Sequence, residues 1–257
     1  MSEQRAFGDV ALAQNPEPRC ASVLLIDVSG SMGEIVANAG RDTGQTVQAD
    51  GRTYRIATSG TTKIDLVNEG LRAYHADMMA DSLARQRVEA SIITFGSGVQ
   101  TVLPFVGAEE FFPPILVAAG ETAMGAGILR AIEAIDARKR LYRENGLNYF
   151  RPWIFLITDG RPVETPPDLW RTAAERVHAG EKKKEFAFFA VGVQGAGEAT
   201  DFDVLKQISV RQPLPLKGYS FREMFIWLSQ SQRTLSHSSP NQEDQVKFDS
   251  PAGWANL

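Results

Sequence analysis

Cysteine is almost absent from this sequence, because Cys20 stands alone among 257 residues, and there are only three histidines. One cysteine excludes an intramolecular disulfide framework and any cysteine-rich zinc site. No apolar run approaches the ~20 residues that a membrane-spanning helix needs. Residues 1–18 contain no apolar core of a signal peptide. We therefore expect a cytoplasmic protein that has no membrane partner.

An excess of charge of one sign is also lacking, since 27 basic residues face 31 acidic ones and the net charge is −4. A non-specific nucleic-acid binder is expected to carry a positive balance or a basic stripe, and neither is present. Hydrophobic residues make up 43% of the chain and charged residues 23%, as in ordinary globular proteins. A chain of this size buries a sizeable hydrophobic core without needing disulfide bonds or structural metals.

Short apolar, β-branched segments alternate with segments of helical period, which predicts a mainly parallel sheet covered by helices. The strand candidates are residues 21–26, 88–95, 99–105, 153–158 and 186–193. Only three residues separate the second candidate from the third, so these two favour an antiparallel hairpin with 99–105 as an edge strand. We predict a three-layer α/β/α fold around a six-stranded, mostly parallel sheet.

Helices are predicted from apolar spacing and from capping patterns. One long amphipathic helix is predicted from Ile64, Val67, Leu71, Tyr74, Met78 and Leu83, a second from Met124, Ile128, Ile132 and Ile135, and a last one from Phe221. A serine or threonine followed three residues later by an acid predicts a capping box. This pattern occurs at Thr62 with Asp65, Thr165 with Asp168, Thr200 with Asp203, and Ser220 with Glu223.

We predict one domain over residues 18–235, with an N-terminal arm at 1–17 and a polar tail or surface strap at 236–257. Residues 34–61 interrupt the expected passage from the first strand to its helix. Within them, the segment QTVQADGRTYRI predicts an inserted β-hairpin with Asp50 and Gly51 at its turn.

Chemistry is concentrated in the segment that directly follows the first predicted strand, Asp27-Val28-Ser29-Gly30-Ser31. Three short oxygen-bearing side chains at alternate positions converge where the chain curls, and Gly30 permits the bend. Carboxylate and hydroxyl oxygens are hard ligands that suit Mg²⁺ or Mn²⁺ and are poor for zinc or copper. Alone, the pattern also fits a strand-ending turn.

Two further segments point to the same site. Thr122 lies in a glycine-flanked loop before the second helix, and Asp159 follows the most hydrophobic strand. In an open α/β sheet, loops at the carboxyl ends of the strands share one crevice, where ligands bind. Two carboxylates, three hydroxyls and water can complete an octahedral shell around one divalent ion.

With these residues in the order D-x-S-x-S, threonine, aspartate, the sequence resembles the von Willebrand factor A (VWA) domains that carry a metal-ion-dependent adhesion site. The matching positions are Asp27, Ser29, Ser31, Thr122 and Asp159. The resemblance covers roughly residues 18–235 and implies a Rossmann-like α/β fold. It also implies a bound Mg²⁺, or Mn²⁺ or Ca²⁺, whose remaining position is filled by a carboxylate from a partner protein.

Within that family, the sequence looks most like bacterial TerY-type proteins associated with tellurite resistance. The segments that carry this likeness are VLLIDVSGSM, VEASIITFGS, WIFLITDGRP, FREMFIWLSQS and the closing GW. The likeness implies work alongside a Ser/Thr kinase and a PP2C-type phosphatase in stress or defence signalling. Residues 34–61 depart from the family pattern, and they begin at the rim of the metal site.

Two other functions remain open. Asp27 at a strand end invites comparison with a Mg²⁺-dependent phosphohydrolase that uses an aspartyl-phosphate. That chemistry needs a second acid two residues later as general acid/base, and Ser29 stands there. The other alternative is a structural VWA domain with a vestigial metal site.

Overall fold

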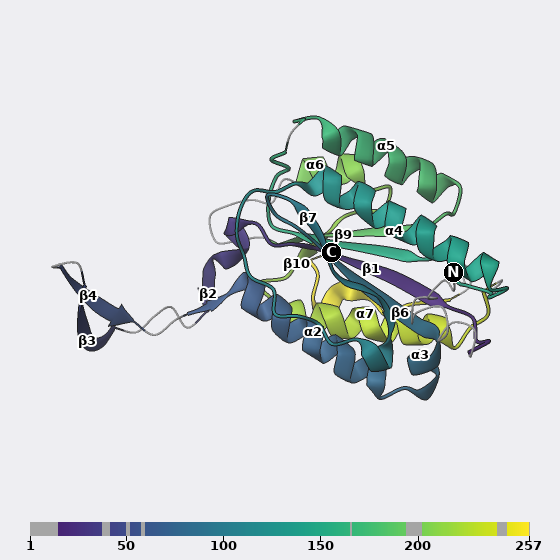
Figure 1. Ribbon diagram of the computed structural model, residues 1–257, viewed down its shortest axis with the longest axis horizontal. Helices are drawn as coiled ribbons and strands as arrows, with labels where there is room; N and C mark the ends of the chain where they lie inside the picture. The colour runs from purple at the N-terminus through teal and green to yellow at the C-terminus, as the bar shows by residue number, and fades with distance from the viewer. Residues whose placement is uncertain are drawn as a thin grey trace, which may run out of the picture.

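A six-stranded sheet forms the middle layer of the protein (Figure 1). The structure, a computed structural model, describes residues 15–37, 42–49, 52–57, 60–164, 166–193, 202–240 and 246–256. The strand order is β10-β9-β8-β1-β6-β7. The strands are β1 (Cys20–Asp27), β6 (Val88–Phe95), β7 (Val99–Gly107), β8 (Trp153–Thr158), β9 (Ala187–Val193) and β10 (Leu214–Leu216).

All neighbouring strands in this sheet are parallel except β6 and β7, which are antiparallel. The predicted fold class, with an antiparallel strand at one edge, is therefore confirmed. The sixth strand, β10, was not among the segments that we predicted from the sequence. It has only three residues, and Pro215 at its centre is tolerated because β10 is an edge strand.

Helices cover both faces of the sheet (Figure 1). On one face lie α2 (Lys63–Met79), α3 (Ser82–Arg87) and α7 (Phe221–Ser236), and on the other α4 (Met124–Glu144), α5 (Leu169–Lys182) and α6 (Phe202–Ile208). Leu24 and Ile26 of β1 point to the first face, whereas Val23 and Leu25 point to the second, as the alternation of a strand requires. No helix within the described ranges is long and apolar enough to cross a membrane.

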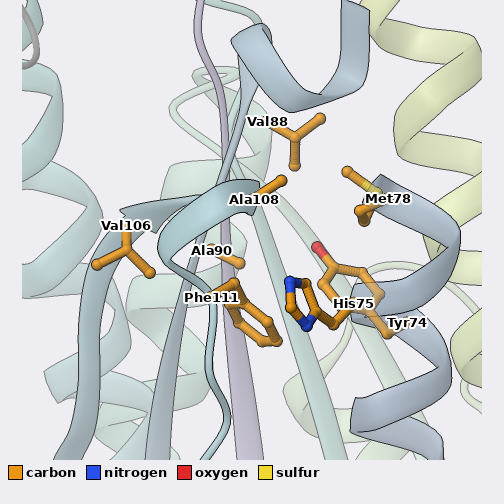
Figure 2. A pocket seen from close by; sticks show the side chains of 8 residues that line it. All are labelled: Tyr74, His75, Met78, Val88, Ala90, Val106, Ala108 and Phe111. Carbon is orange, nitrogen blue, oxygen red and sulfur yellow. The ribbon is translucent and has the colours of Figure 1, made fainter. Parts of the chain in front are cut away.

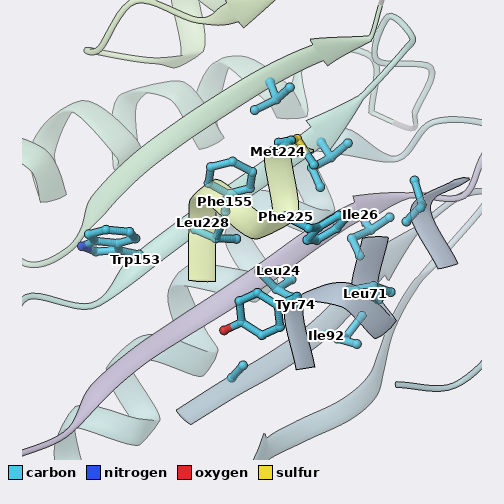
Figure 3. Close-up of a cluster of buried hydrophobic side chains, with 14 of the residues drawn as sticks. Leu24, Ile26, Leu71, Tyr74, Ile92, Trp153, Phe155, Met224, Phe225 and Leu228 are labelled. Carbon is cyan, nitrogen blue, oxygen red and sulfur yellow. The ribbon is translucent and has the colours of Figure 1, made fainter. Parts of the chain in front are cut away.

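The core beneath α2 and α7 is rich in aromatic side chains (Figure 3). Tyr74 of α2 and Phe225 of α7 meet edge to face, with ring centroids 6.5 Å apart. The Tyr74 hydroxyl donates to Gln232, whose amide nitrogen donates to Ser22 Oγ of β1 at 2.6 Å. These two bonds join the buried polar groups of Tyr74, Gln232 and Ser22 to one another, as buried polar groups in an apolar core require.

The prediction of a single long helix through Leu83 is wrong, because α2 ends at Met79 and a separate helix, α3, begins at Ser82. The Asp81 carboxylate accepts hydrogen bonds from the backbone N–H groups of Leu83 at 3.0 Å and Ala84 at 2.7 Å. A side chain that satisfies these free donors starts a new helix. The apolar period continues across the break, so it does not reveal the break.

Of the predicted caps, Thr62 and Asp65 form the expected capping box. Ser220 precedes α7 as predicted but makes no side-chain capping bond, so that capping box is wrong. Asp168 likewise makes no capping bond at the start of α5. Thr165 and Thr200 lie outside the described residues.

The inserted segment contains two pairs of strands. Strand β2 (Ile35–Ala37) pairs with β5 (Thr61–Thr62), and β3 (Asp42–Ala49) pairs antiparallel with β4 (Arg52–Ala57). Ala49 pairs with Arg52, which is the register that a two-residue turn gives, although Asp50 and Gly51 themselves lie outside the described residues. Figure 1 draws β3 and β4 apart from the three layers. The predicted hairpin is therefore present.

The C-terminal segment returns to the sheet. Its Trp254 is buried, and the Trp254 carbonyl accepts from the Lys217 N–H at 2.7 Å, while the Asn256 N–H donates to the Pro215 carbonyl at 2.9 Å. These bonds cover part of the outer edge of β10, which would otherwise leave backbone groups unpaired. The boundaries that we assign to the arm, domain and tail stay predictions.

Candidate metal centre

Asp27 is the last residue of β1, and its side chain is buried at the carboxyl end of the sheet. Asp27 Oδ1 accepts a hydrogen bond from the Ser29 backbone N–H at 2.8 Å. Asp27 Oδ2 accepts one from Thr158 Oγ1, at the end of the neighbouring strand β8, at 2.6 Å. The parallel pairing of β1 with β8 thus orients the carboxylate from two sides.

Ser29, Ser31 and Asp159 form the second part of the site. Ser29 Oγ lies 3.1 Å from Ser31 Oγ, and Ser31 Oγ donates to Asp159 Oδ1 at 2.6 Å. Ser29 precedes the short 3-10 helix η1 (Gly30–Gly33), and Asp159 follows β8. Residues 128 positions apart in the sequence are therefore in direct contact.

Thr122 lies beside this cluster. A Cβ built on Gly160 would lie 3.4 Å from Thr122 Oγ1 and 3.9 Å from Asp27 Oδ2, so both side chains lie close to Gly160. The Thr122 carbonyl accepts hydrogen bonds from the Met124 and Val163 N–H groups, which fixes its loop before α4. The structure thus brings all five predicted residues to one end of the sheet, and their role as ligands stays a prediction.

Backbone hydrogen bonds join the loops that carry these residues. The Gly30 N–H donates to the Gly120 carbonyl at 2.9 Å, and the Ala119 N–H donates to the Val28 carbonyl at 2.7 Å. Gly120 has φ +85°, a conformation that L side chains rarely adopt, which explains the glycine there. The loop that carries Ser29 and Ser31 (the serine loop) is therefore hydrogen-bonded to the loop that carries Thr122 (the threonine loop) without the help of an ion.

Burial makes the charged form of Asp27 unfavourable. It raises the pKa of Asp27 to about 6, although the hydrogen bonds from Thr158 and Ser29 oppose the shift and the nearby Asp159 carboxylate reinforces it. None of the ion pairs among the described residues involves Asp27. A buried carboxylate without a cation is stabilised when a positive charge binds beside it.

Lys63 belongs to this site, and the sequence analysis missed it. Its Nζ lies 2.8 Å from Asp159 Oδ2 and 2.6 Å from Glu34 Oε2, and its side chain is only 2% exposed. Burial alone would lower the pKa of Lys63, but the hydrogen bonds and charges of Asp159 and Glu34 outweigh it and raise that pKa. The available signal was a lysine directly after a helix cap, where the positive helix end disfavours a cation.

Glu164 is a second residue that the sequence analysis missed. Its carboxylate accepts from the Gly125 and Ala126 N–H groups, both at 3.1 Å, at the start of α4. Burial raises the pKa of Glu164, and these hydrogen bonds oppose the shift. Ala123 at the N-cap offers no side-chain acceptor, so a carboxylate from the loop after β8 anchors the helix that follows Thr122.

Another recess lies between α2, β6 and β7 (Figure 2) and is lined mainly by apolar side chains. Its volume is about 10 Å³, which is the space of about one water molecule. The His75 ring points into it beside Phe111 (Figure 2). We conclude that this recess is a small packing gap without room for a ligand.

The donor chemistry of the site fits a hard divalent ion. Within the described ranges, no group of three or more His, Cys, Asp or Glu side chains could hold a metal. The candidate site instead combines three hydroxyl groups with two carboxylates, Asp27 and Asp159. Oxygen donors of this kind suit Mg²⁺, Mn²⁺ and Ca²⁺.

Comparison with known proteins gives matches in structure and none in sequence. No family model and no curated protein matches the sequence. The pilus adhesin SpaC from Lactobacillus rhamnosus GG matches with a TM-score of 0.58 at 14% identity, over 86% of this chain and 32% of that one. The PilB minor pilin from Streptococcus sanguinis matches with a TM-score of 0.57 at 10% identity, over 84% and 62%.

Proximal thread matrix protein 1 from the mussel byssus matches with a TM-score of 0.51 at 15% identity, over 85% of this chain and 49% of that one. The chain has a VWA-like fold. A further structure of the mussel protein is described as having a zinc-occupied MIDAS motif, a metal-ion-dependent adhesion site. This chain spans about half of the mussel protein. At such low sequence identities, these matches show a similar fold and nothing more.

Proposed function

We propose that this chain is a divalent-cation-dependent protein-binding module. Asp27, Ser29, Ser31, Thr122 and Asp159 would hold the ion, and a carboxylate of a partner protein would complete its coordination. The observation that carries the proposal is the meeting of three hydroxyls and two buried carboxylates, in preformed loops, at one end of the sheet. Asp27 in particular is buried, and none of the ion pairs among the described residues involves it.

The hydroxyl-rich donor set explains why binding of an acidic partner is favoured. Neutral hydroxyl oxygens donate weakly, so the ion retains positive charge and a preference for an external anion. Thr158 orients Asp27, as the outer hydrogen bonds of metal sites orient their ligands. Mg²⁺ is the ion that we expect, with Mn²⁺ and Ca²⁺ as alternatives. The zinc in the mussel protein's motif makes Zn²⁺ worth testing as well.

The surface beside the site supports a protein as the partner. An open groove of about 570 Å³ lies between residues 114–117 and 96–98, and Val28 of the serine loop lines it. Phe112, Ile115 and Val117 are 70%, 81% and 73% exposed in the same stretch. Clustered exposed apolar side chains are typical of surfaces that partners cover. The acidic partner would bury them while its carboxylate reaches the ion.

The resemblance to TerY-type proteins supports a more specific partner set. Under this proposal, the acidic partner is a Ser/Thr kinase or a PP2C-type phosphatase, and the pathway is a bacterial stress or defence response. Residues 34–61 leave from the rim of the site and would influence which partner binds. Loops on a rigid scaffold often carry such specificity.

Binding without turnover is the second part of the proposal. A phosphohydrolase would need an exposed aspartate nucleophile and a second acid, whereas Asp27 is fully buried with both oxygens hydrogen-bonded, and Ser29 replaces the acid. We expect no hydrolysis of p-nitrophenyl phosphate with Mg²⁺ or Mn²⁺. Turnover that disappears in an Asp27→Asn variant would contradict this expectation.

The proposed function is tested with Mn²⁺, because water bound to this paramagnetic ion relaxes faster. We expect the chain to bind Mn²⁺ and to enhance water proton relaxation, since the partner's position holds water in its absence. Adding acetate, the simplest carboxylate, should lower the enhancement at constant bound Mn²⁺. Absence of Mn²⁺ binding, or an enhancement that acetate leaves unchanged, would contradict an open metal site.

A further inference from the structure

The ammonium group of Lys63 lies directly beside the candidate metal site. The two oxygens of Asp159 face different partners: Oδ1 accepts from Ser31 at 2.6 Å, and Oδ2 accepts from Lys63 Nζ at 2.8 Å. Asp159 is therefore shared between the hydroxyl cluster and an ammonium group. An ion bound by Ser31 and Asp159 would have Lys63 as its nearest positive neighbour among these side chains.

The buried position of Lys63 lowers the stability of the fold unless nearby negative charges balance its ammonium group. It is the first residue of α2, where the positive end of the helix dipole disfavours a cation. Its side chain is 2% exposed, and a buried ammonium needs close partners of opposite charge. Asp159 and Glu34 supply them, and the Lys63 N–H also donates to the Glu34 carbonyl at 3.1 Å. The local structure thus fixes both ends of the lysine.

Glu34 provides an alternative partner for the ammonium. Its side chain is 45% exposed, whereas that of Asp159 is 1% exposed, so Lys63 bridges an outer and an inner carboxylate. Glu34 follows η1, the short helix that contains Ser31. When ionised, the carboxylates of Asp27, Asp159 and Glu34 carry two more charges than the Lys63 ammonium balances. Among these four described side chains, one divalent ion would balance that excess.

We propose that Lys63 is the resident counter-cation of the metal site and sets its affinity. The proposal rests on the proposed function. Without a metal, Lys63 holds Asp159 in place. With a metal bound, its charge repels the ion and reduces the electron donation of Asp159, so the site binds metal weakly until a partner carboxylate adds its negative charge. Lys63 is thus a positioning residue that couples metal retention to partner binding.

The test compares the Mn²⁺ affinity of charge-changing variants at fixed ionic strength. Lys63→Met keeps the length of the side chain and removes its charge, and we expect Mn²⁺ to bind about tenfold more tightly or better. Lys63→Arg keeps the charge and should stay close to wild type. Glu34→Gln removes the outer carboxylate, so Mn²⁺ should bind a few-fold more weakly. Lys139→Met, which loses a part-buried lysine paired with Asp136 on α4, should leave the affinity unchanged.

Thermal unfolding gives a second readout that separates this role from a purely structural ion pair. In EDTA, Lys63→Met should unfold at a lower temperature than wild type, because two carboxylates lose their cation. Saturating Mn²⁺ should restore more of the melting temperature in the variant than it adds to wild type. A structural ion pair predicts the same loss with and without Mn²⁺.

The outcomes distinguish this inference from the proposed function. Mn²⁺ binding of equal or lower affinity in a folded Lys63→Met variant overturns the inference and leaves the metal site intact. Mn²⁺ binding by wild type that becomes about tenfold tighter in Lys63→Met supports the inference. Absence of binding in both overturns both proposals. If Lys63→Met does not fold, Lys63→Gln and Glu34→Gln decide, since they must shift the affinity in opposite directions.

Discussion

Replacing Asp27 with asparagine is expected to weaken Mn²⁺ binding by about 100-fold or more, because the site loses a charged group that the fold holds ready for a cation. The metal-free variant should remain folded and be at least as stable as wild type at pH 7. Burial raises the pKa of Asp27 from 3.8 to about 6, so without metal its ionisation lowers stability as the pH rises through this range, and the full cost is present at pH 7. Asparagine keeps the shape and removes this cost.

The two effects of Asp27→Asn have opposite signs, which makes the result specific. Titration calorimetry measures the affinity, and thermal unfolding in EDTA measures the stability. Asp168→Asn is the matched control, because Asp168 is 77% exposed and pairs across one helical turn with Arg171. That control should retain wild-type metal binding. An Asp27→Asn variant that binds Mn²⁺ within threefold of wild type would remove Asp27 from the site.

The largest loss of stability is expected at the other end of the sheet, from Glu89→Gln. Glu89 is 8% exposed, and it lies 2.7 Å from Arg138 Nη2 and 3.3 Å from Arg19 Nε, while also accepting from the Tyr142 hydroxyl. Burial of the ring and, next to it, the charge of Glu89 raise the pKa of Tyr142 well above its usual value. Neutralising Glu89 leaves two largely buried guanidinium groups without their shared carboxylate.

Removing one member of a buried ion pair costs about 3–5 kcal/mol. For a domain of this size, ~2–4 °C corresponds to about 1 kcal/mol, so the melting temperature should fall by about 6–20 °C. Glu144→Gln is the control, because Glu144 is exposed on the same helix as Arg138 and should change stability by at most about 0.5 kcal/mol. A fall of less than 2 °C for Glu89→Gln would show that this cluster does not hold β6 to β1 and α4.

The central sheet could be predicted because strands buried on both faces have nearly continuous apolar sequences. β1 and β8 are buried at every residue, and the predicted segments lie within one or two residues of the observed ones. β10 could not be predicted because it has only three residues with a proline at its centre, which is too short for a recognisable strand pattern. The break at Asp81 could not be predicted because the apolar spacing continues from α2 into α3.

The candidate site could be predicted in part for a similar physical reason. Parallel strands end at one edge of the sheet, so Asp27 and Asp159 had to lie near each other once β1 and β8 were recognised. Lys63 and Glu164 could not be found in this way. Lys63 reaches Asp159 across 96 positions and Glu164 reaches α4 across 39, and these contacts depend on how α2 and α4 pack rather than on local spacing.

The claim of a metal centre at the carboxyl end of β1 is tested most directly by locating the ion. Crystals of the wild-type chain grown with saturating Mn²⁺ should give a strong anomalous difference peak. We expect this peak to lie among the hydroxyls of Ser29, Ser31 and Thr122, on the Oδ1 side of Asp159, with Lys63 on the opposite side. A well-ordered site without a peak, or Mn²⁺ bound only at other residues, would contradict it.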